Sequence, residues 1–393
     1  MRFSPFVERI SGHGVAAWDI HHEAFNAQRD GADVIILSIG DPDFATPDFI
    51  TQAAIDALRA GDTHYTDIAG RPALRQAIAE RYSQRIGRSV PADNVIAVAG
   101  AQNALFMASM CLLQAGDEVV VLDPMYVTYE ATLKASGATL VRATCFPEDG
   151  FRLREAALKS AITPHTRAIF LSNPNNPTGV VLDRQELQCV ADLAIAHDLW
   201  VVVDEVYESL CYEREHQSLA SLPGMEKRCV VIGSLSKSHA MTGWRIGWMI
   251  ADAELIGHAE TLALSMLYGL PGFVMEGALA AVKAHEPVTR EMRETYRRRR
   301  DLVVGRLSDC PGLAVLVPDA GMFVLVDVRG TGLGSLDFAW RLYREAGVSV
   351  LDAAAFGEPA QGFVRLSFTL SDEQLARACE RIAGFVDQLP RAV

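Results

Sequence analysis

Short apolar runs alternate with amphipathic stretches through the middle of the chain. The runs rich in valine, isoleucine and leucine predict strands at Val95–Ala99, Glu118–Leu122, Leu140–Ala143, Ala168–Ser172, Trp200–Asp204 and Val230–Ser234. Apolar residues at helical spacing predict helices between them at Ala101–Gln114, Val127–Ser136 and Arg184–His197. Strands that alternate with helices indicate an α/β fold with a mostly parallel sheet flanked by helices. Such a sheet binds its ligands at the carboxyl ends of the strands.

The pattern changes after Gly247. Longer amphipathic stretches predict helices at Ala253–Leu267, Phe273–His285 and Pro287–Leu307. A smaller α/β unit follows, with strands at Met322–Asp327 and Val364–Phe368 and helices at Leu336–Ala346 and Asp372–Asp387. A chain of 393 residues, half of them hydrophobic, exceeds what one core usually holds. We therefore expect a large domain over residues 46–285, a small domain over 286–393, and an N-terminal segment over 1–45 that packs with the small domain.

Charge and cysteine content narrow the classes of protein. The net charge of −13 argues against binding to nucleic acid or to an anionic membrane. The basic run Arg297–Arg300 lies in a predicted helix, and we interpret it as a solvated helix face. Neither a signal peptide nor a stretch of transmembrane length is evident. The seven cysteines form no CxxC pair and indicate small core residues in a reducing compartment, so we expect a cytoplasmic protein without a metal site.

Lysine is scarce, which narrows the search for a nucleophile. Of five lysines, only Lys237 directly follows an apolar strand, in Ser234-Leu235-Ser236-Lys237-Ser238-His239. A lysine that is shielded from water and close to other cations loses its proton readily and becomes a nucleophile. Position alone leaves a simple turn lysine equally open.

Polar side chains near Lys237 suit an anionic, aromatic ligand. Arg245 can hold a phosphate by paired hydrogen bonds, with hydroxyl donors from Ser234 and Ser236, although a structural salt bridge would also explain this arginine. Asp204 ends a buried strand and needs a cation or strong hydrogen bonds, which a pyridinium nitrogen would supply. A helix N-cap is the alternative for this aspartate. Tyr207 is close enough in sequence to reach the same ligand.

Two loops add further candidate ligand-binding groups. Asn173-Pro174-Asn175-Asn176-Pro177-Thr178-Gly179 combines rigid turns with amide donors. Gly100-Ala101-Gln102 joins a strand to a helix, and the free amides at a helix start bind phosphate. Either segment alone is also typical of an ordinary loop.

In order along the chain, these pieces resemble the class I/II (fold type I) aminotransferases, which depend on pyridoxal 5'-phosphate (PLP). Essentially the whole chain takes part. The matching segments are Ser38 to Phe44, His64 to Gly70, Gly100 to Leu105, Asp123 to Tyr126, Asn173 to Gly179, Asp204 to Tyr207, Ser234 to Lys237, Gly243 to Gly247 and Arg365 to Phe368.

The resemblance implies a role for each matched position. Lys237 corresponds to the Schiff-base lysine, which also moves a proton between the substrate Cα and the cofactor C4′. Asp204 corresponds to the partner of the pyridine nitrogen, and Tyr126 to the ring stacked on the cofactor. The donors to the phenolic oxygen correspond to Asn176 and Tyr207. The phosphate cradle corresponds to Gly100, Ala101, Gln102, Ser234 and Arg245.

The resemblance also implies how substrate and partner bind. Arg365 corresponds to the fork that grips the substrate α-carboxylate, helped by the backbone at Gly40 and by Asn176. Tyr65 would reach the phosphate from the neighbouring subunit, which implies a homodimer with shared active sites. The substrates would be a small-molecule amino acid and a 2-oxo acid.

Three segments resemble the arginine–pyruvate group of the family: Ala17 to His21, Asp123 to Tyr129, and Leu235 to Trp248 with Met266 to Gly269. That resemblance implies L-arginine as amino donor and pyruvate as acceptor. A guanidinium needs an anionic or aromatic pocket, for which Asp19, Glu23 and Tyr268 are candidates. For the two acids a solvated helix face is the alternative.

Two departures and several alternatives remain. Gln102 replaces the small hydroxyl or basic residue that relatives often carry, and no arginine lies in Met266–Leu270, which argues against aspartate as preferred donor. A broad aminotransferase for neutral or aromatic amino acids, or a PLP β-lyase, would share the same cofactor site. A PLP-binding DNA regulator lacks room before Val34, and a nicotinamide dehydrogenase would need a G-x-G-x-x-G after a strand.

Overall fold

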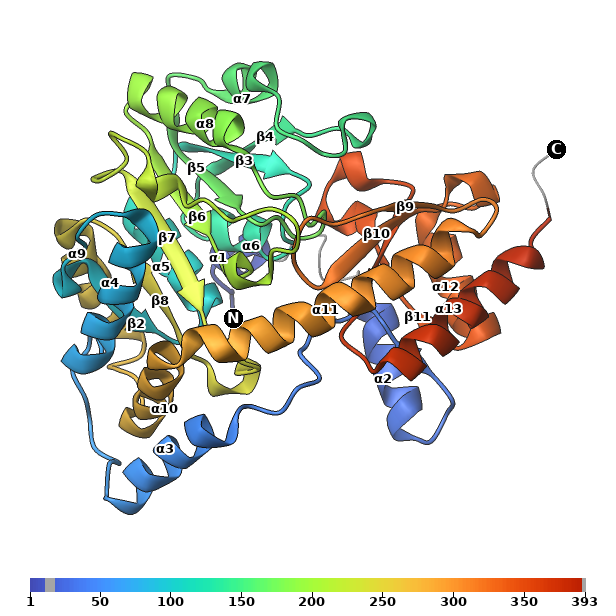
Figure 1. Cartoon of the computed structure of the whole chain (residues 1–393). Coiled ribbons are helices and arrows are strands. Elements are labelled where there is room, and N and C mark those ends of the chain that lie inside the picture. The colour runs from blue at the N-terminus through green and yellow to red at the C-terminus, as the bar shows by residue number, and fades with distance from the viewer. Residues whose placement is uncertain (11–17, 391–393) are drawn as a thin grey trace.

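The computed structural model describes residues 1–10 and 18–390. Within this part of the chain, seven strands form one sheet in the order β2-β8-β7-β6-β5-β3-β4 (Figure 1). The strands are β2 (Val95–Val98), β3 (Glu118–Asp123), β4 (Thr139–Thr144), β5 (Thr166–Ser172), β6 (Trp200–Asp204), β7 (Cys229–Ser234) and β8 (Gly247–Ile250). Strand β8 is antiparallel to both of its neighbours, β2 and β7. All other neighbouring strands in this sheet are parallel. The predicted mostly parallel sheet of an α/β fold is confirmed.

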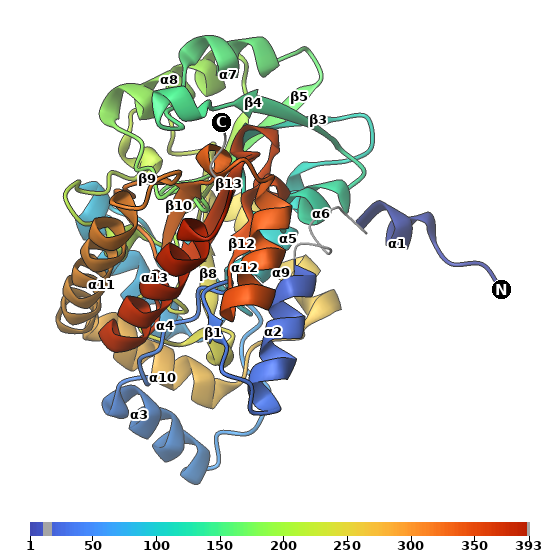
Figure 2. The same cartoon turned by 90° about the vertical axis from the view of Figure 1, so that its right-hand side faces the viewer.

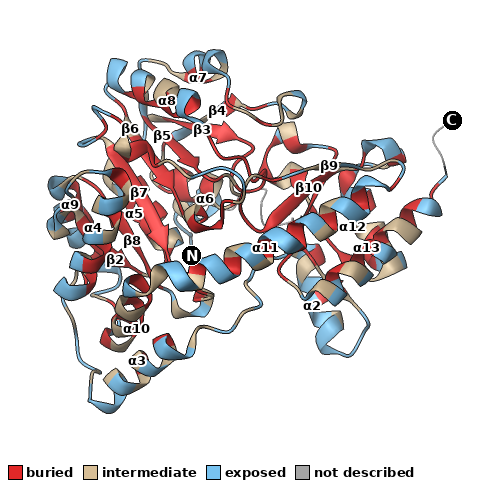
Figure 3. Ribbon diagram, in the orientation of Figure 1, coloured by how far each residue is buried: buried red, intermediate tan, exposed pale blue. Residues whose placement is uncertain are grey.

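Helices cover both faces of this sheet. One face packs against α5 (Ala101–Leu112), α6 (Tyr129–Lys134) and α9 (Ala253–Met266). The other packs against α4 (Pro72–Ile86), α7 (Glu155–Ala161), α8 (Arg184–Ala196) and α10 (Gly272–Lys283), with α3 (Asp48–Arg59) against α10. Val201 and Val203 belong to one core and Val202 to the other, because successive side chains of a strand point to opposite faces. Both faces of the central strands are therefore buried (Figure 3).

A smaller antiparallel sheet lies beside the first, in the order β12-β13-β10-β9. Its strands are β9 (Ala314–Leu316), β10 (Phe323–Asp327), β12 (Leu351–Asp352) and β13 (Phe363–Ser367), and the helices α12 (Ser335–Ala346) and α13 (Asp372–Asp387) belong to the same part of the chain. The long helix α11 (His285–Ser308) runs from the large sheet to this unit (Figure 1).

Residues 19–36 of the N-terminal segment lie against the small unit. Strand β1 (Ile35–Ile36) pairs in parallel with β11 (Val348–Ser349), and α2 (Asp19–Arg29) lies beside α12 (Figure 2). Helix α1 (Pro5–Ile10) contacts α6. The domain limits at residues 45 and 285 stay a prediction. Short 3-10 turns occupy Ala92–Asn94, Pro147–Asp149, Glu208–Leu210, Leu219–Ser221, Thr242–Trp244, Arg329–Thr331, Ala353–Phe356 and Glu358–Ala360.

The basic run in α11 differs from the prediction. Arg297 and Arg298 are exposed, but Arg299 and Arg300 are buried, so the interpretation as one solvated face is wrong for the second pair. Arg299 forms a bidentate pair with Asp43, 2.7 and 2.8 Å long, and Arg300 a similar pair with Glu213. Consecutive helical residues point about 100° apart, so a run of four cannot share one face.

Across the described ranges, no helix combines the length and the apolarity that crossing a bilayer requires. Nor do three or more histidine, cysteine, aspartate or glutamate side chains gather there in a way that could hold a metal ion.

Candidate active site

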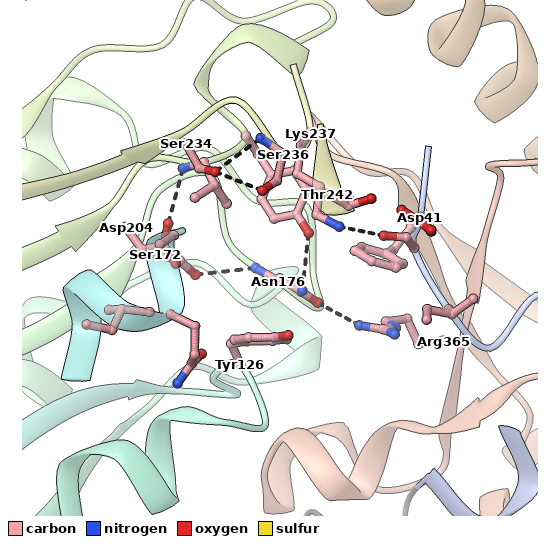
Figure 4. A pocket seen from close by; sticks show the side chains of 18 of the residues that line it. Asp41, Tyr126, Ser172, Asn176, Asp204, Ser234, Ser236, Lys237, Thr242 and Arg365 are labelled. Carbon is pink, nitrogen blue, oxygen red and sulfur yellow. Dashed lines mark hydrogen bonds between the residues drawn. The ribbon is translucent and has the colours of Figure 1, made fainter. Parts of the chain in front are cut away.

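The carboxyl ends of the parallel strands open into a cavity of about 350 Å³ (Figure 4). Ser172, Asp204 and Ser234 end three adjacent strands and all line it. Phe323 and Arg365 of the small sheet close the opposite side. The cavity thus lies where the α/β pattern predicts a ligand, between the two sheets.

Lys237 lies in the turn that follows β7. Its Nζ donates a hydrogen bond to the carbonyl oxygen of Gly40, at 2.6 Å. Burial lowers the pKa of this amine to about 8, with smaller contributions from the positive charges of Arg365 and Arg245, against the opposing effect of Asp41. The neutral, nucleophilic amine is therefore accessible close to neutral pH.

Asp204 is a buried carboxylate at the end of β6. One oxygen accepts from the backbone N–H of Val206 and the other from the hydroxyl of Tyr129, each at 3.1 Å. No cationic side chain of the described residues pairs with it, and burial raises its pKa to about 6. A positively charged ring nitrogen would balance the negative charge of this carboxylate, which no cationic side chain of the described residues does.

Asn176 joins the two sides of the cavity. Its side-chain nitrogen donates to the hydroxyl of Tyr207 at 3.5 Å, and its side-chain oxygen accepts from Arg365 at 2.9 Å. Asn176 and Tyr207 are both 5% exposed. The half-buried ring of Tyr126 also lines the cavity, edge-on to Tyr129. Polar donors and an aromatic face are thus arranged around a space suited to a substituted aromatic ring.

A cradle for an anion lies at the start of α5. Gly100 has φ +84°, and a Cβ there would lie 2.4 Å from the guanidinium of Arg245, so glycine lets that side chain lie against the helix start. The first amides of a helix have no acceptor within it and favour phosphate. Ser234 and Ser236, whose hydroxyls lie 2.9 Å apart, border the same space. The side chain of Gln102 is engaged elsewhere, with Thr128 and Thr132 of the α6 region, and leaves its backbone amide for the anion.

Arg365 is a buried guanidinium that forms no ion pair with any carboxylate of the described residues. It is 2% exposed and stacks between the rings of Phe323 and Phe356, at 3.9 and 4.6 Å. Besides Asn176, it donates only to the carbonyl of Ser38, at 3.2 Å, and its Nε has no partner among the described residues. Burial lowers its pKa to about 10. A ligand carboxylate would compensate this charge.

Four predicted residues lie away from the cavity. Asp19 is exposed at the first position of α2 and does not line it, and Glu23 is exposed on the same helix. Tyr65 is 86% exposed and Tyr268 52% exposed, and their ring centroids lie 4.8 Å apart at a separate surface depression.

The site also includes residues that the sequence interpretation did not assign. Trp18, Asp41 and Phe323 line the cavity, while Tyr129 contacts Asp204 and Phe356 contacts Arg365. The spacing of Tyr126 and Tyr129, three apart at the start of a helix, could have indicated a shared face. The aromatic walls of Arg365 come from distant parts of the chain and leave no local signal.

The fold and the cavity define a PLP enzyme: a lysine nucleophile, a carboxylate for a ring nitrogen, a phosphate cradle and a carboxylate-binding arginine surround one space. The family model for aminotransferases of class I and II matches residues 32–382. The chain belongs to this family of PLP-dependent enzymes, which act on amino acids and 2-oxo acids.

Individual relatives of the chain are aminotransferases as well. The chain is 52% identical to arginine–pyruvate transaminase AruH of Pseudomonas aeruginosa over 383 residues, 98% of each chain. It is 37% identical to the aspartate/prephenate aminotransferase of Thermus thermophilus, over 93% of this chain and 94% of that one. The solved structure of the aspartate aminotransferase from Thermus thermophilus with maleate superposes with a TM-score of 0.93 at 35% identity, covering 98% of this chain and 100% of that one.

Proposed function

We propose that this aminotransferase moves the α-amino group of L-arginine to pyruvate in two half-reactions of a ping-pong cycle. PLP, when bound, supplies an electron sink for the carbanion at the substrate Cα. Lys237 would hold the cofactor, and its neutral amine would move a proton from the substrate Cα to the cofactor C4′. Arg365 orients the α-carboxylate of the amino acid in one half-reaction and of the oxo acid in the other.

The arrangement of the cavity supports a role for each remaining residue. Asp204 would keep the ring nitrogen protonated, while Tyr207 and Asn176 would hold the phenolic oxygen. Tyr126 would offer its face to the ring. The phosphate cradle would consist of Gly100, Ala101, Gln102, Ser234, Ser236 and Arg245. The Gly40 backbone adds to the carboxylate site, where the small sheet and the segment after β1 meet.

The balance of charge in the cavity is the main observation that supports L-arginine as the amino donor. Its wall holds three cationic side chains, Lys237, Arg245 and Arg365, and two acidic ones, Asp41 and Asp204. The cofactor phosphate would balance the charge of Arg245, the substrate α-carboxylate that of Arg365, and the cofactor ring nitrogen that of Asp204. Lys237 would react as the neutral amine and needs no counter-ion. Asp41 is left without an ion-pair partner among the described residues and favours a donor whose side chain carries a positive charge.

The position of Asp41 supports this assignment. Figure 4 places it on the same side of the cavity as Arg365 and opposite Asp204. Trp18 also lines the cavity and offers an aromatic face on which a guanidinium stacks favourably. The 52% identical relative, which is an arginine–pyruvate transaminase, supports the same donor and pyruvate as the acceptor.

A single-turnover panel of amino donors tests the proposal. We expect L-arginine to convert the PLP form faster than L-citrulline, its neutral isostere, and faster than L-aspartate or L-phenylalanine. Asp41→Asn should lower the arginine-to-citrulline ratio about tenfold or more, because a hydrogen bond to a charged group contributes about 1.5–3 kcal/mol. The ratio cancels any effect of Asp41 on Lys237 that both donors share.

The results of the donor panel distinguish the proposed function from its alternatives. If Asp19→Asn lowers the ratio and Asp41→Asn does not, the first turn of α2 recognises the guanidinium. If arginine is no faster than aspartate or phenylalanine in the wild type, the arginine assignment is wrong. Release of ammonia and a 2-oxo acid without an acceptor would instead indicate a β-lyase.

We also propose a homodimer in the cytoplasm. The exposed rings of Tyr65 and Tyr268, which do not line the cavity of their own chain, suit contacts with the active site of a second copy. The free cysteines suit a reducing compartment. Sedimentation should give twice the chain mass, and Tyr65→Ala should weaken PLP binding; a monomer with full PLP affinity would contradict the shared site.

A further inference from the structure

The segment that follows β6 has two faces. Asp204 and Tyr207 line the cavity, whereas the side chains of Glu205 and Glu208 are only 1% and 16% exposed and lie in a separate buried cluster. The backbone N–H of Glu205 donates to Ile232 of the adjacent strand, at 2.9 Å. The same short segment therefore supplies two groups to the cavity and two carboxylates behind it.

Two arginines of α4 hold those carboxylates. Arg85 forms ion pairs with both Glu205 and Glu208, the second at 2.6 Å. Arg81, one turn earlier, pairs with Glu208. The hydroxyl of Ser218 donates to Glu205 at 2.6 Å. Arg85 thus links two carboxylates that lie three residues apart, and fixes the turn between them, which includes Tyr207.

The same cluster reaches the loop that carries Asn176. His216 donates from Nε2 to the carbonyl of Asn173 at 3.0 Å, and this nitrogen lies 4.0 Å from Glu205. The backbone N–H of Asn173 in turn donates to the carbonyl of Asp204 at 3.0 Å. One network therefore holds both segments that face the cofactor ring.

The charges of this network cancel. Two arginines face two glutamates, and burial lowers the pKa of each nearby histidine, to about 3 for His239 and about 2 for His285, so these rings stay neutral. Burial also lowers the pKa of His216. Removal of one charge would leave a buried partner uncompensated, whereas removal of both would not.

We propose that Arg85 and Glu205 are positioning residues, which hold Asp204, Tyr207 and Asn176 against the cofactor from behind the cavity. The proposal rests on the roles given above to these three groups. Neither Arg85 nor Glu205 lines the cavity, so both act through the backbone of the segments that they anchor. A shift of about 1 Å in such a segment is enough to lower a rate about a hundredfold.

Three variants of the holoenzyme test this: Arg85→Met, Glu205→Gln, and the double variant. Arg75→Met is the control on the same helix, because the side chain of Arg75 pairs with the exposed Asp93 and donates to the backbone carbonyl of Val95 rather than to the segment after β6. Each is measured by thermal unfolding, by PLP affinity, by the pH midpoint of the visible absorbance of the bound cofactor, and by kcat and KM for several donors.

We expect Arg85→Met to shift the midpoint by about half a pH unit or more and to lower kcat about tenfold to a hundredfold. The KM of each donor should stay within about twofold, because the carboxylate site is untouched. The double variant should regain thermal stability, since no buried charge remains unpaired, yet keep the low kcat and the shifted midpoint. Arg75→Met should resemble the wild type.

The opposite results overturn the proposal. If kcat and the midpoint return together with stability in the double variant, the network only stabilises the fold. If Arg85→Met fails to fold, Glu205→Gln, which keeps the side-chain shape, is assessed by the same measurements, and an unchanged midpoint with unchanged kcat refutes the role. A wild type without any visible absorbance would instead contradict the proposed roles of Lys237 and Asp204.

Discussion

Replacement of Arg365 by methionine removes a buried positive charge and keeps much of the side-chain volume. Arg365 is 2% exposed, has no carboxylate partner among the described residues, and offers an unpaired Nε–H. Loss of a buried partner for a substrate charge costs about 2–5 kcal/mol. At about 1.4 kcal/mol per tenfold change, kcat/KM should fall between about 30-fold and several thousand-fold.

The assay is single-turnover reaction with donors of different side chains, such as arginine, alanine, aspartate and phenylalanine. Because every donor carries the same α-carboxylate, the loss should be similar for all of them. The unliganded variant should be at least as stable as the wild type, since an uncompensated buried charge is costly in the folded state. Arg329→Met is the control, as Arg329 lies on the same small unit with its side chain 59% exposed.

A loss confined to one donor would refute this reasoning, because it would place Arg365 in the side-chain pocket. An unchanged kcat/KM for all donors would show that another group binds the carboxylate. A large drop in stability would show that the contacts with Asn176 and Ser38 outweigh the burial of charge.

Two further outcomes follow from the cofactor site. Gly100→Ala should weaken PLP binding by about tenfold or more, because the new Cβ would lie 2.4 Å from the Arg245 guanidinium at a residue whose φ is +84°. Gly61→Ala is the control for backbone strain, because Gly61 has φ +86° but lies in open space. Equal PLP affinity in the two variants would contradict the role of the Arg245 contact. The rate at which PLP attaches to the cofactor-free protein should rise with pH up to about 8 and then level off, because only the neutral Lys237 amine attacks. A rate that does not change between about pH 6 and 9 would contradict the lowered pKa.

Much of the large sheet could be predicted because its parallel strands are buried on both faces. Runs such as Val201–Val203 are then almost wholly apolar and stand out in the sequence. Strand β8 was not predicted, since it is short and begins with Gly247, where a Cβ would lie 2.8 Å from the Gly233 carbonyl oxygen. The order of the strands depends on which edges meet in space and has no local signal.

The residues of the site also differ in whether the local sequence predicts them. Lys237 and Asp204 could be predicted because each lies at the carboxyl end of a strand that the pattern predicts, and the order of the family motifs strengthened the assignment. Tyr129, Phe356 and Arg85 act through partners far away in the sequence, and nothing beside them marks the contact. Arg85 lies in an ordinary amphipathic helix, and only the structure shows its pairing with Glu205.

The pairing of β1 with β11 bears on how the protein is made. The segment that carries Gly40 leaves the ribosome early, but its partner strand and Arg365 come from the last part of the chain. Domains generally fold as units, starting from the N-terminus during synthesis. The large sheet can therefore form on the ribosome before residues 348–365 are made, whereas the substrate side of the cavity needs them. A chain cut before β11 would hold cofactor-facing groups without a place for the amino acid.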